Sequence, residues 1–73
     1  MRNTITDLSR SEIEYLIDEY VVGRNAERDR MILKRRLIDG ITYERLAEEF
    51  DLSTVHVKEI IKSRQNKLFK RLG

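Results

Sequence analysis

Apolar residues recur along the chain at helical intervals of three and four residues, and no segment alternates apolar with polar residues as a half-buried strand would. This spacing predicts four helices, over residues 10–22, 26–39, 43–50 and 54–71. The first of them would bury a face made of Ile13, Leu16, Ile17, Tyr20 and Val21. Proline is absent, and the three glycines fall outside the predicted helices. We therefore expect an all-α fold, a compact four-helix domain.

Short polar residues stand where the helices are expected to begin. Ser9 and Glu12 have the spacing of a capping box at the start of the first helix. The residues expected to cap the three later helices are Asn25, Thr42 and Ser53. Gly23 and Gly40 are expected to end the first and second helices, because glycine readily adopts the left-handed backbone that follows a helix.

The chain has 73 residues and no cysteine, which limits it to one small domain without disulfides or a cysteine-bound zinc ion. Residues 1–8 are expected to be a flexible N-terminus, and residues 9–73 to form the single domain. No apolar run approaches the roughly 18 residues that a membrane span needs. The first residues also lack the apolar stretch of a signal peptide, so we expect a cytoplasmic protein.

Charge is distributed unevenly, although the formal net charge is only +2. Residues 1–53 carry nine basic and twelve acidic side chains, a net charge of −3. Residues 54–73 carry six basic side chains and a single acidic one, Glu59, a net charge of +5. A strongly positive C-terminal helix favours a polyanionic partner, most simply nucleic acid.

Residues 43–62 have the layout of a helix-turn-helix, in which a short helix and a tight turn lead to a longer basic helix. Ala47 supplies the small residue that two steeply crossing helices need where they approach most closely. Asp51 stands in the turn, where aspartate is one of the few residues besides glycine that tolerate a left-handed backbone. The apolar anchors on the two sides of the turn are Leu46, Phe50, Leu52, Val57 and Ile60 or Ile61.

The last helix separates into an apolar face and a polar face when its residues are placed about 100° apart. The apolar face holds Val57, Ile60, Ile61, Leu68 and Leu72, which leaves the opposite face to enter the major groove of double-stranded DNA. The residues expected at base edges are Thr54, Val55, Lys58, Glu59 and Lys62. The residues expected at phosphates are Thr42, Arg45, Ser53, His56, Lys67, Lys70 and Arg71. Glu59 has the acceptor oxygens that a cytosine amino group requires.

A longer pattern runs over residues 28–72: a helix that ends in glycine, a threonine cap, then aromatic-Glu-x-apolar-Ala, apolar-Ser and Val-Lys. Its elements here are Gly40, Thr42, Tyr43-Glu44, Leu46-Ala47, Leu52-Ser53 and Val57-Lys58. This pattern resembles region 4 of bacterial sigma factors, and the whole chain looks like the small stand-alone sigma-like proteins of Firmicutes and their prophages. The resemblance implies binding of promoter-like DNA in transcription regulation, contact with RNA polymerase, and a bacterial or phage-infected cell.

The chain departs from the pattern of that family at two positions. Asp51 stands where the family usually has glycine, and Glu59 stands where it often has a polar or basic residue. The family's bound DNA sequence therefore does not carry over to this chain. With 73 residues we also expect no room for the domain with which a sigma factor opens the promoter.

Two alternative functions fit the same sequence, because a fold does not fix a function. One is a protein-interaction module, and the other is a phage DNA-packaging protein, since small terminase subunits also use helix-turn-helix domains. Phe69 and Leu72 on the last helix, together with an exposed flank of the first, are compatible with a homodimer. The tyrosines expected at the edge of the core are Tyr15, Tyr20 and Tyr43.

No combination of residues predicts catalysis, a metal or a cofactor. His56 and Glu59 are only two groups, fewer than the three or four ligands of a zinc site. The acidic residues of the third helix and the turn are expected to be solvated rather than paired for acid–base chemistry: Glu44, Glu48, Glu49 and Asp51. No nucleophile–base pair and no glycine-rich phosphate loop is visible, so we do not expect an enzyme.

Overall fold

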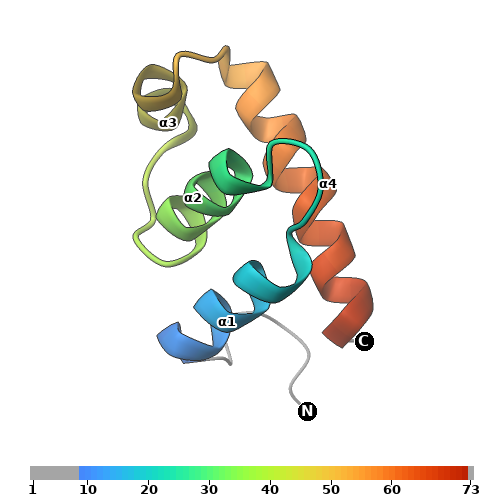
Figure 1. Ribbon diagram of the computed structural model, residues 1–73. Coiled ribbons are helices and arrows are strands. Elements are labelled where there is room, and N and C mark those ends of the chain that lie inside the picture. The colour runs from blue at the N-terminus through green and yellow to red at the C-terminus, as the bar shows by residue number, and fades with distance from the viewer. Residues whose placement is uncertain (1–8, 73) are drawn as a thin grey trace.

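The computed structural model describes residues 9–72, and the side chains of all of these except residues 69, 71 and 72. It contains four helices: α1 over Arg10–Tyr20, α2 over Ala26–Leu37, α3 over Tyr43–Phe50 and α4 over Thr54–Leu72 (Figure 1). No strand occurs among the residues described. The predicted all-α class and the four helices are confirmed.

The long helix α4 organises the fold, because it packs against each of the other three helices. The first turns of α4 lie beside α3, its middle lies beside α2, and its C-terminal part passes α1 (Figure 1). The α4 residues that face away from these three helices, such as Val55, Lys58 and Lys62, are exposed.

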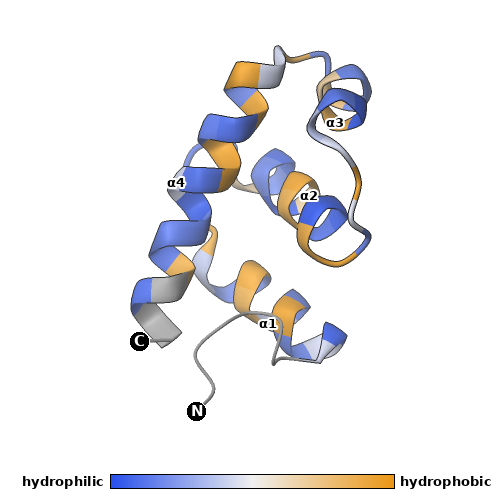
Figure 2. Ribbon diagram, turned by 180° about the vertical axis from the view of Figure 1, so that it is seen from behind, coloured by the Kyte–Doolittle hydropathy of each residue, from blue (hydrophilic) through white to orange (hydrophobic). Residues whose placement is uncertain are grey.

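The core is built from apolar side chains of all four helices. Ile17, Leu33, Leu46 and Val57, one from each helix in order, are 0% exposed. The hydrophobic stretches of the helices turn toward one another, and the hydrophilic stretches turn outward (Figure 2). Two of the three tyrosines, Tyr20 and Tyr43, pack at the edge of the core as predicted. The prediction for Tyr15 is wrong, because its position on the outer side of α1 leaves it 62% exposed.

The helix ends differ from the predicted ends by one or two residues. α1 stops at Tyr20 because Val21 turns to an extended conformation, which buries its side chain to 1% exposure, so the chain leaves the helix before Gly23. α2 stops at Leu37 rather than at residue 39, and Gly40 follows with a φ of 70°. α3 has the predicted bounds, and α4 reaches Leu72.

The caps at the helix starts are confirmed with one exception. Ser9 and Glu12 form the predicted capping box, in which the Ser9 Oγ accepts from the Glu12 N–H and the Glu12 carboxylate accepts from the Ser9 N–H. The prediction for Asn25 is wrong, because its side chain makes no cap hydrogen bond. Asn25 has a φ of 61°, in the left-handed region, whereas a side-chain cap requires an extended backbone that directs the side chain back over the first turn.

Candidate nucleic-acid interface

Local hydrogen bonds fix the path of the chain from α3 to α4. The Thr42 Oγ1 accepts from the Arg45 N–H at 3.1 Å, which caps α3, and the Ser53 Oγ accepts from the His56 N–H at 3.0 Å, which caps α4. Between them Asp51 adopts the left-handed backbone, with φ 56° and ψ 48°, as predicted. The Leu52 N–H reaches back to the Ala47 carbonyl at 2.9 Å, which gives the helix end the form of a Schellman motif.

Buried apolar residues hold α3 against the start of α4. Leu46 and Val57 are 0% exposed, and Ala47 is 7% exposed. The partly buried Phe50 and Leu52 close the two sides of the turn. Because both caps, the turn and these contacts are set locally, α4 leaves the turn in a fixed direction.

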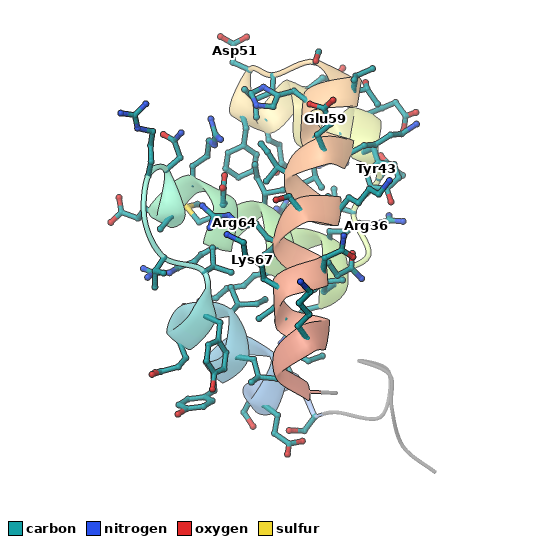
Figure 3. All side chains as sticks on the ribbon, turned by 90° about the vertical axis from the view of Figure 1, so that its right-hand side faces the viewer. Arg36, Tyr43, Asp51, Glu59, Arg64 and Lys67 are labelled. Atoms are coloured by element: carbon teal, nitrogen blue, oxygen red, sulfur yellow. The ribbon has the colours of Figure 1, made fainter. Side chains whose placement is uncertain are left out.

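The two faces of α4 match the predicted division wherever the side chains are described. Ile60, Ile61 and Leu68 are at most 8% exposed. On the opposite face, here named the reading face, Val55 is 66% exposed, and Lys58, Glu59 and Lys62 are also exposed. Figure 3 looks onto this face and shows Tyr43 and Arg36 on one side of α4, with Arg64 and Lys67 on the other.

Lysines without acidic partners distinguish α4 from the rest of the domain. Lys58, Lys62, Lys67 and Lys70 make no ion pair with any residue that the structure describes. By contrast, the basic side chains of the first three helices that form ion pairs are Arg10, Arg28, Lys34, Arg35 and Arg45. Most positive charge of α1 to α3 is thus neutralised within the protein, and that of α4 is available to a polyanion.

The consecutive basic residues of α2 are structural, which the sequence did not reveal. Lys34 pairs with Asp18 of α1 at 2.8 Å, and Arg35 pairs with Glu49 of α3. Arg36 donates to the Ile41 carbonyl at 3.0 Å. These partners lie in other elements, so spacing along α2 alone contains no signal for them.

An aromatic ring links α2 to the reading face of α4. The Arg36 guanidinium lies 4.3 Å and the Lys58 ammonium 5.5 Å from the centroid of the Tyr43 ring, distances at which a cation is attracted to the ring face. Tyr43 therefore restrains Lys58 on one flank of α4.

The Arg35–Glu49 pair joins α2 to α3 and carries the clearest electrostatic effect. The hydrogen bond from the Arg35 guanidinium lowers the pKa of the Glu49 carboxyl, and the charges of Arg35 and Arg45 act in the same direction. The same hydrogen bond raises the pKa of Arg35. Glu49 is therefore paired, not the freely solvated carboxylate that was predicted. Glu44, Glu48 and Asp51 are exposed, as predicted.

The structure places the predicted DNA-contacting residues in different settings. Thr54 is half-buried at the start of α4, and the hydroxyls of Thr42 and Ser53 already serve as caps. Arg45 lies 3.7 Å from the Glu49 carboxylate. The exposed candidates whose side chains form no hydrogen bond or ion pair with a described residue are Val55, His56, Lys58, Glu59, Lys62, Lys67 and Lys70. The Arg71 side chain, like those of Phe69 and Leu72, lies outside the described residues, and contact of any candidate with DNA stays a prediction.

Neither a metal site nor a membrane span occurs among the described residues. No three histidine, cysteine, aspartate or glutamate side chains in this part of the chain gather in a way that could hold a metal ion. No helix within it is both long and apolar enough to cross a membrane.

A capped short helix, a left-handed turn and a longer helix with unpaired lysines define a DNA-binding helix-turn-helix domain. The family model described as Sigma-70, region 4 matches residues 26–70, which covers α2, α3 and nearly all of α4. The chain belongs to the sigma-70 region 4 family, as its sequence pattern indicated. No curated protein and no solved structure is a significant match to the chain.

Proposed function

We propose that the protein binds specific sequences of double-stranded DNA in the control of transcription, with α4 in the major groove. Thr54, Val55, Lys58, Glu59 and Lys62 face the base edges in this proposal. The phosphate contacts are those of Thr42, Arg45, Ser53, His56, Lys67, Lys70 and Arg71. The first set supplies sequence selection, and the second supplies most of the affinity.

The observation that supports this proposal most strongly is the exposed face of α4. Lys58 and Lys62 lie there one turn apart, without acidic partners among the described residues, next to a well-exposed Val55. A helix that binds in a groove needs donors free to reach bases and phosphates, and these two lysines meet that need.

Binding to duplex DNA tests the proposal directly. In vitro selection gives the preferred duplex, and its affinity is compared with that of random duplex over a range of salt concentrations. We expect a strong preference for the selected duplex and an affinity that falls steeply with salt. Random duplex that binds as tightly as selected duplex would contradict sequence-specific regulation and favour the DNA-packaging role.

A paired variant tests the assignment of α4. Lys58→Ala/Lys62→Ala is expected to weaken binding of the selected duplex by about tenfold or more, since each specific contact is worth ~1–3 kcal/mol. Arg10→Ala/Lys34→Ala removes the same positive charge from the side of α1 and α2, where Arg10 pairs with Asp39 and Lys34 with Asp18. Equal losses for the two double variants would overturn the role of α4.

A protein contact is a second candidate function, favoured by exposed apolar residues away from the reading face. Tyr15 is 62% exposed on α1, and Met31 is 53% exposed on α2. RNA polymerase and a second copy of the chain are the two partners we consider. Light scattering over a range of concentrations tests the dimer, and Tyr15→Ser should weaken polymerase binding without changing DNA affinity.

A further inference from the structure

One arginine outside α4 differs from all the other basic residues of the first three helices and their loops that the structure describes. Arg24 is exposed, and no described residue pairs with its guanidinium. The other basic side chains of this part either form ion pairs or, as with Arg30 and Arg36, donate to backbone carbonyls. Arg24 therefore shares the unpaired state of the α4 lysines.

Arg24 lies in the loop between α1 and α2, beside one flank of α4. A shallow groove on this flank is lined by Arg24 from the loop and by His56, Ser63 and Lys67 from α4. The carboxylate-bearing Glu59 of the reading face also lines this groove, so Arg24 lies on a surface contiguous with the reading face of α4. In Figure 3 this flank, marked by Arg64 and Lys67, lies on the side of α4 opposite Tyr43 and Arg36.

Arg64 of α4 holds the loop that carries Arg24. Its Nη2 donates to the Arg24 carbonyl at 3.1 Å, and its Nη1 donates to the Val22 carbonyl at 2.9 Å. Its Nε donates to the Asp29 carboxylate at 2.9 Å, which neutralises the acid that also lines the groove. The backbone at residues 22–24 is thus fixed to α4, and Arg24 keeps a defined position beside the helix.

We propose that Arg24, together with His56 and Lys67, forms a binding site for a backbone phosphate of the DNA. This inference rests on the proposed function. A helix in the major groove lies between the two phosphate backbones, so each flank of the helix faces one of them. Tyr43 lies on one flank of α4, beside Lys58, and the loop between α1 and α2 lies on the other, where it adds a contact to the phosphate backbone on that side. The DNA-binding surface then extends beyond residues 26–70, the part that matches the family.

Salt dependence of binding tests the phosphate site. The logarithm of the affinity falls with the logarithm of the salt concentration by ~0.9 per phosphate contacted. Arg24→Ala is expected to reduce the slope by about 0.9, so its affinity deficit relative to wild type shrinks about 3.5-fold between about 50 and about 200 mM salt. The deficit should be the same on selected and on random duplex, because a phosphate contact carries no sequence information.

Two further variants serve as controls. Arg10→Ala removes an equal charge from the far end of α1, where Arg10 pairs with Asp39, and should keep the wild-type slope. Arg24→Lys keeps a positive charge and should restore most of the slope. Thermal unfolding checks that all variants are folded.

The outcomes separate this inference from the proposed function. If wild type binds with a steep salt dependence and Arg24→Ala behaves like Arg10→Ala, the phosphate site alone is overturned. A deficit confined to selected duplex would also overturn it, because Arg24 would then read bases. If wild-type binding does not depend on salt, the proposed function fails, and the phosphate site fails with it.

Discussion

Asp29 and Arg64 are 35 residues apart in the chain, and their side chains meet at 2.9 Å between α2 and α4. The Asp29 side chain is 7% exposed and that of Arg64 13% exposed. Arg28 donates to the other carboxylate oxygen of Asp29 at 3.1 Å. The buried carboxylate is thus satisfied from two sides, and the pair ties α2 to α4.

Breaking this pair from one side should destabilise the domain strongly. Arg64→Met leaves the buried Asp29 carboxylate with only Arg28, and we expect a loss of about 3 kcal/mol in the free energy of unfolding, measured by urea denaturation. Asp29→Asn/Arg64→Met removes the stranded charge and should recover part of that loss. Lys62→Met, on the exposed face of the same helix, should change stability by less than ~0.5 kcal/mol. If the loss in the double variant equals the sum of the losses in Arg64→Met and Asp29→Asn measured alone, the two residues do not interact.

Asp51 offers a simple route to a more stable turn. Its φ of 56° costs a residue with a side chain more than it costs glycine. We expect Asp51→Gly to raise the free energy of unfolding by about 0.5–1 kcal/mol and Asp51→Val to lower it by about 1–2 kcal/mol. Asp51→Asn removes the charge but still tolerates the left-handed backbone, so it should be nearly neutral. If the glycine and valine variants are equally stable in urea denaturation, residue 51 does not adopt the left-handed backbone.

Glu49 should make the stability of the domain sensitive to acid. Its pKa is lowered in the folded state by the hydrogen bond from Arg35, so the stabilisation is fully present above the ordinary glutamate pKa. It is lost as the pH falls through the lowered pKa of the folded state. Glu49→Gln should therefore be less stable than wild type near neutral pH, and the two should converge in strong acid.

Thermal unfolding over a series of pH values measures this convergence. Glu48→Gln is the matched control, since Glu48 is exposed and forms no ion pair with a described residue. A constant difference between wild type and Glu49→Gln at every pH would mean that the pair contributes nothing through its charge.

Glu59 should restrict the DNA sequence that is bound. It is the single acidic residue of α4, and a carboxylate accepts from a cytosine amino group but repels phosphates. Glu59→Gln is expected to relax selection at one base pair by about 1–3 kcal/mol and to raise the affinity for random duplex. Repeating the duplex selection with this variant measures both effects. An unchanged preferred site would remove Glu59 from the base-reading set.

The features that could be predicted from the sequence are those set by residues a few positions apart. The capping box of Ser9 and Glu12 and the left-handed turn at Asp51 follow from residue type and spacing within a few positions. The apolar face of α4 follows from helical periodicity in the same way. Asn25 shows the limit of such rules, because the left-handed backbone at that position directs its side chain away from the helix.

The partners of charged residues could not be predicted, because they join separate elements. Arg64 counted in the sequence as one more positive charge of the last helix, yet it is the one described basic residue of α4 that pairs with an acid. Arg35 likewise belongs to a run of basic residues, and only the packing of α2 on α3 brings Glu49 to it. Net charge along the sequence thus overstates the charge that DNA would meet at these positions.

Helix α1 lies outside residues 26–70, yet Ile17 of α1 and Val21, which follows α1, are 0% and 1% exposed in the shared core. A fragment that began at Ala26 would leave apolar side chains of α2 and α4, such as Leu68, without cover. The segment that contributes to one core is therefore longer than the segment that matches the family. Residues 26–70 transplanted alone into another protein would carry the helix-turn-helix without the helix that completes its core.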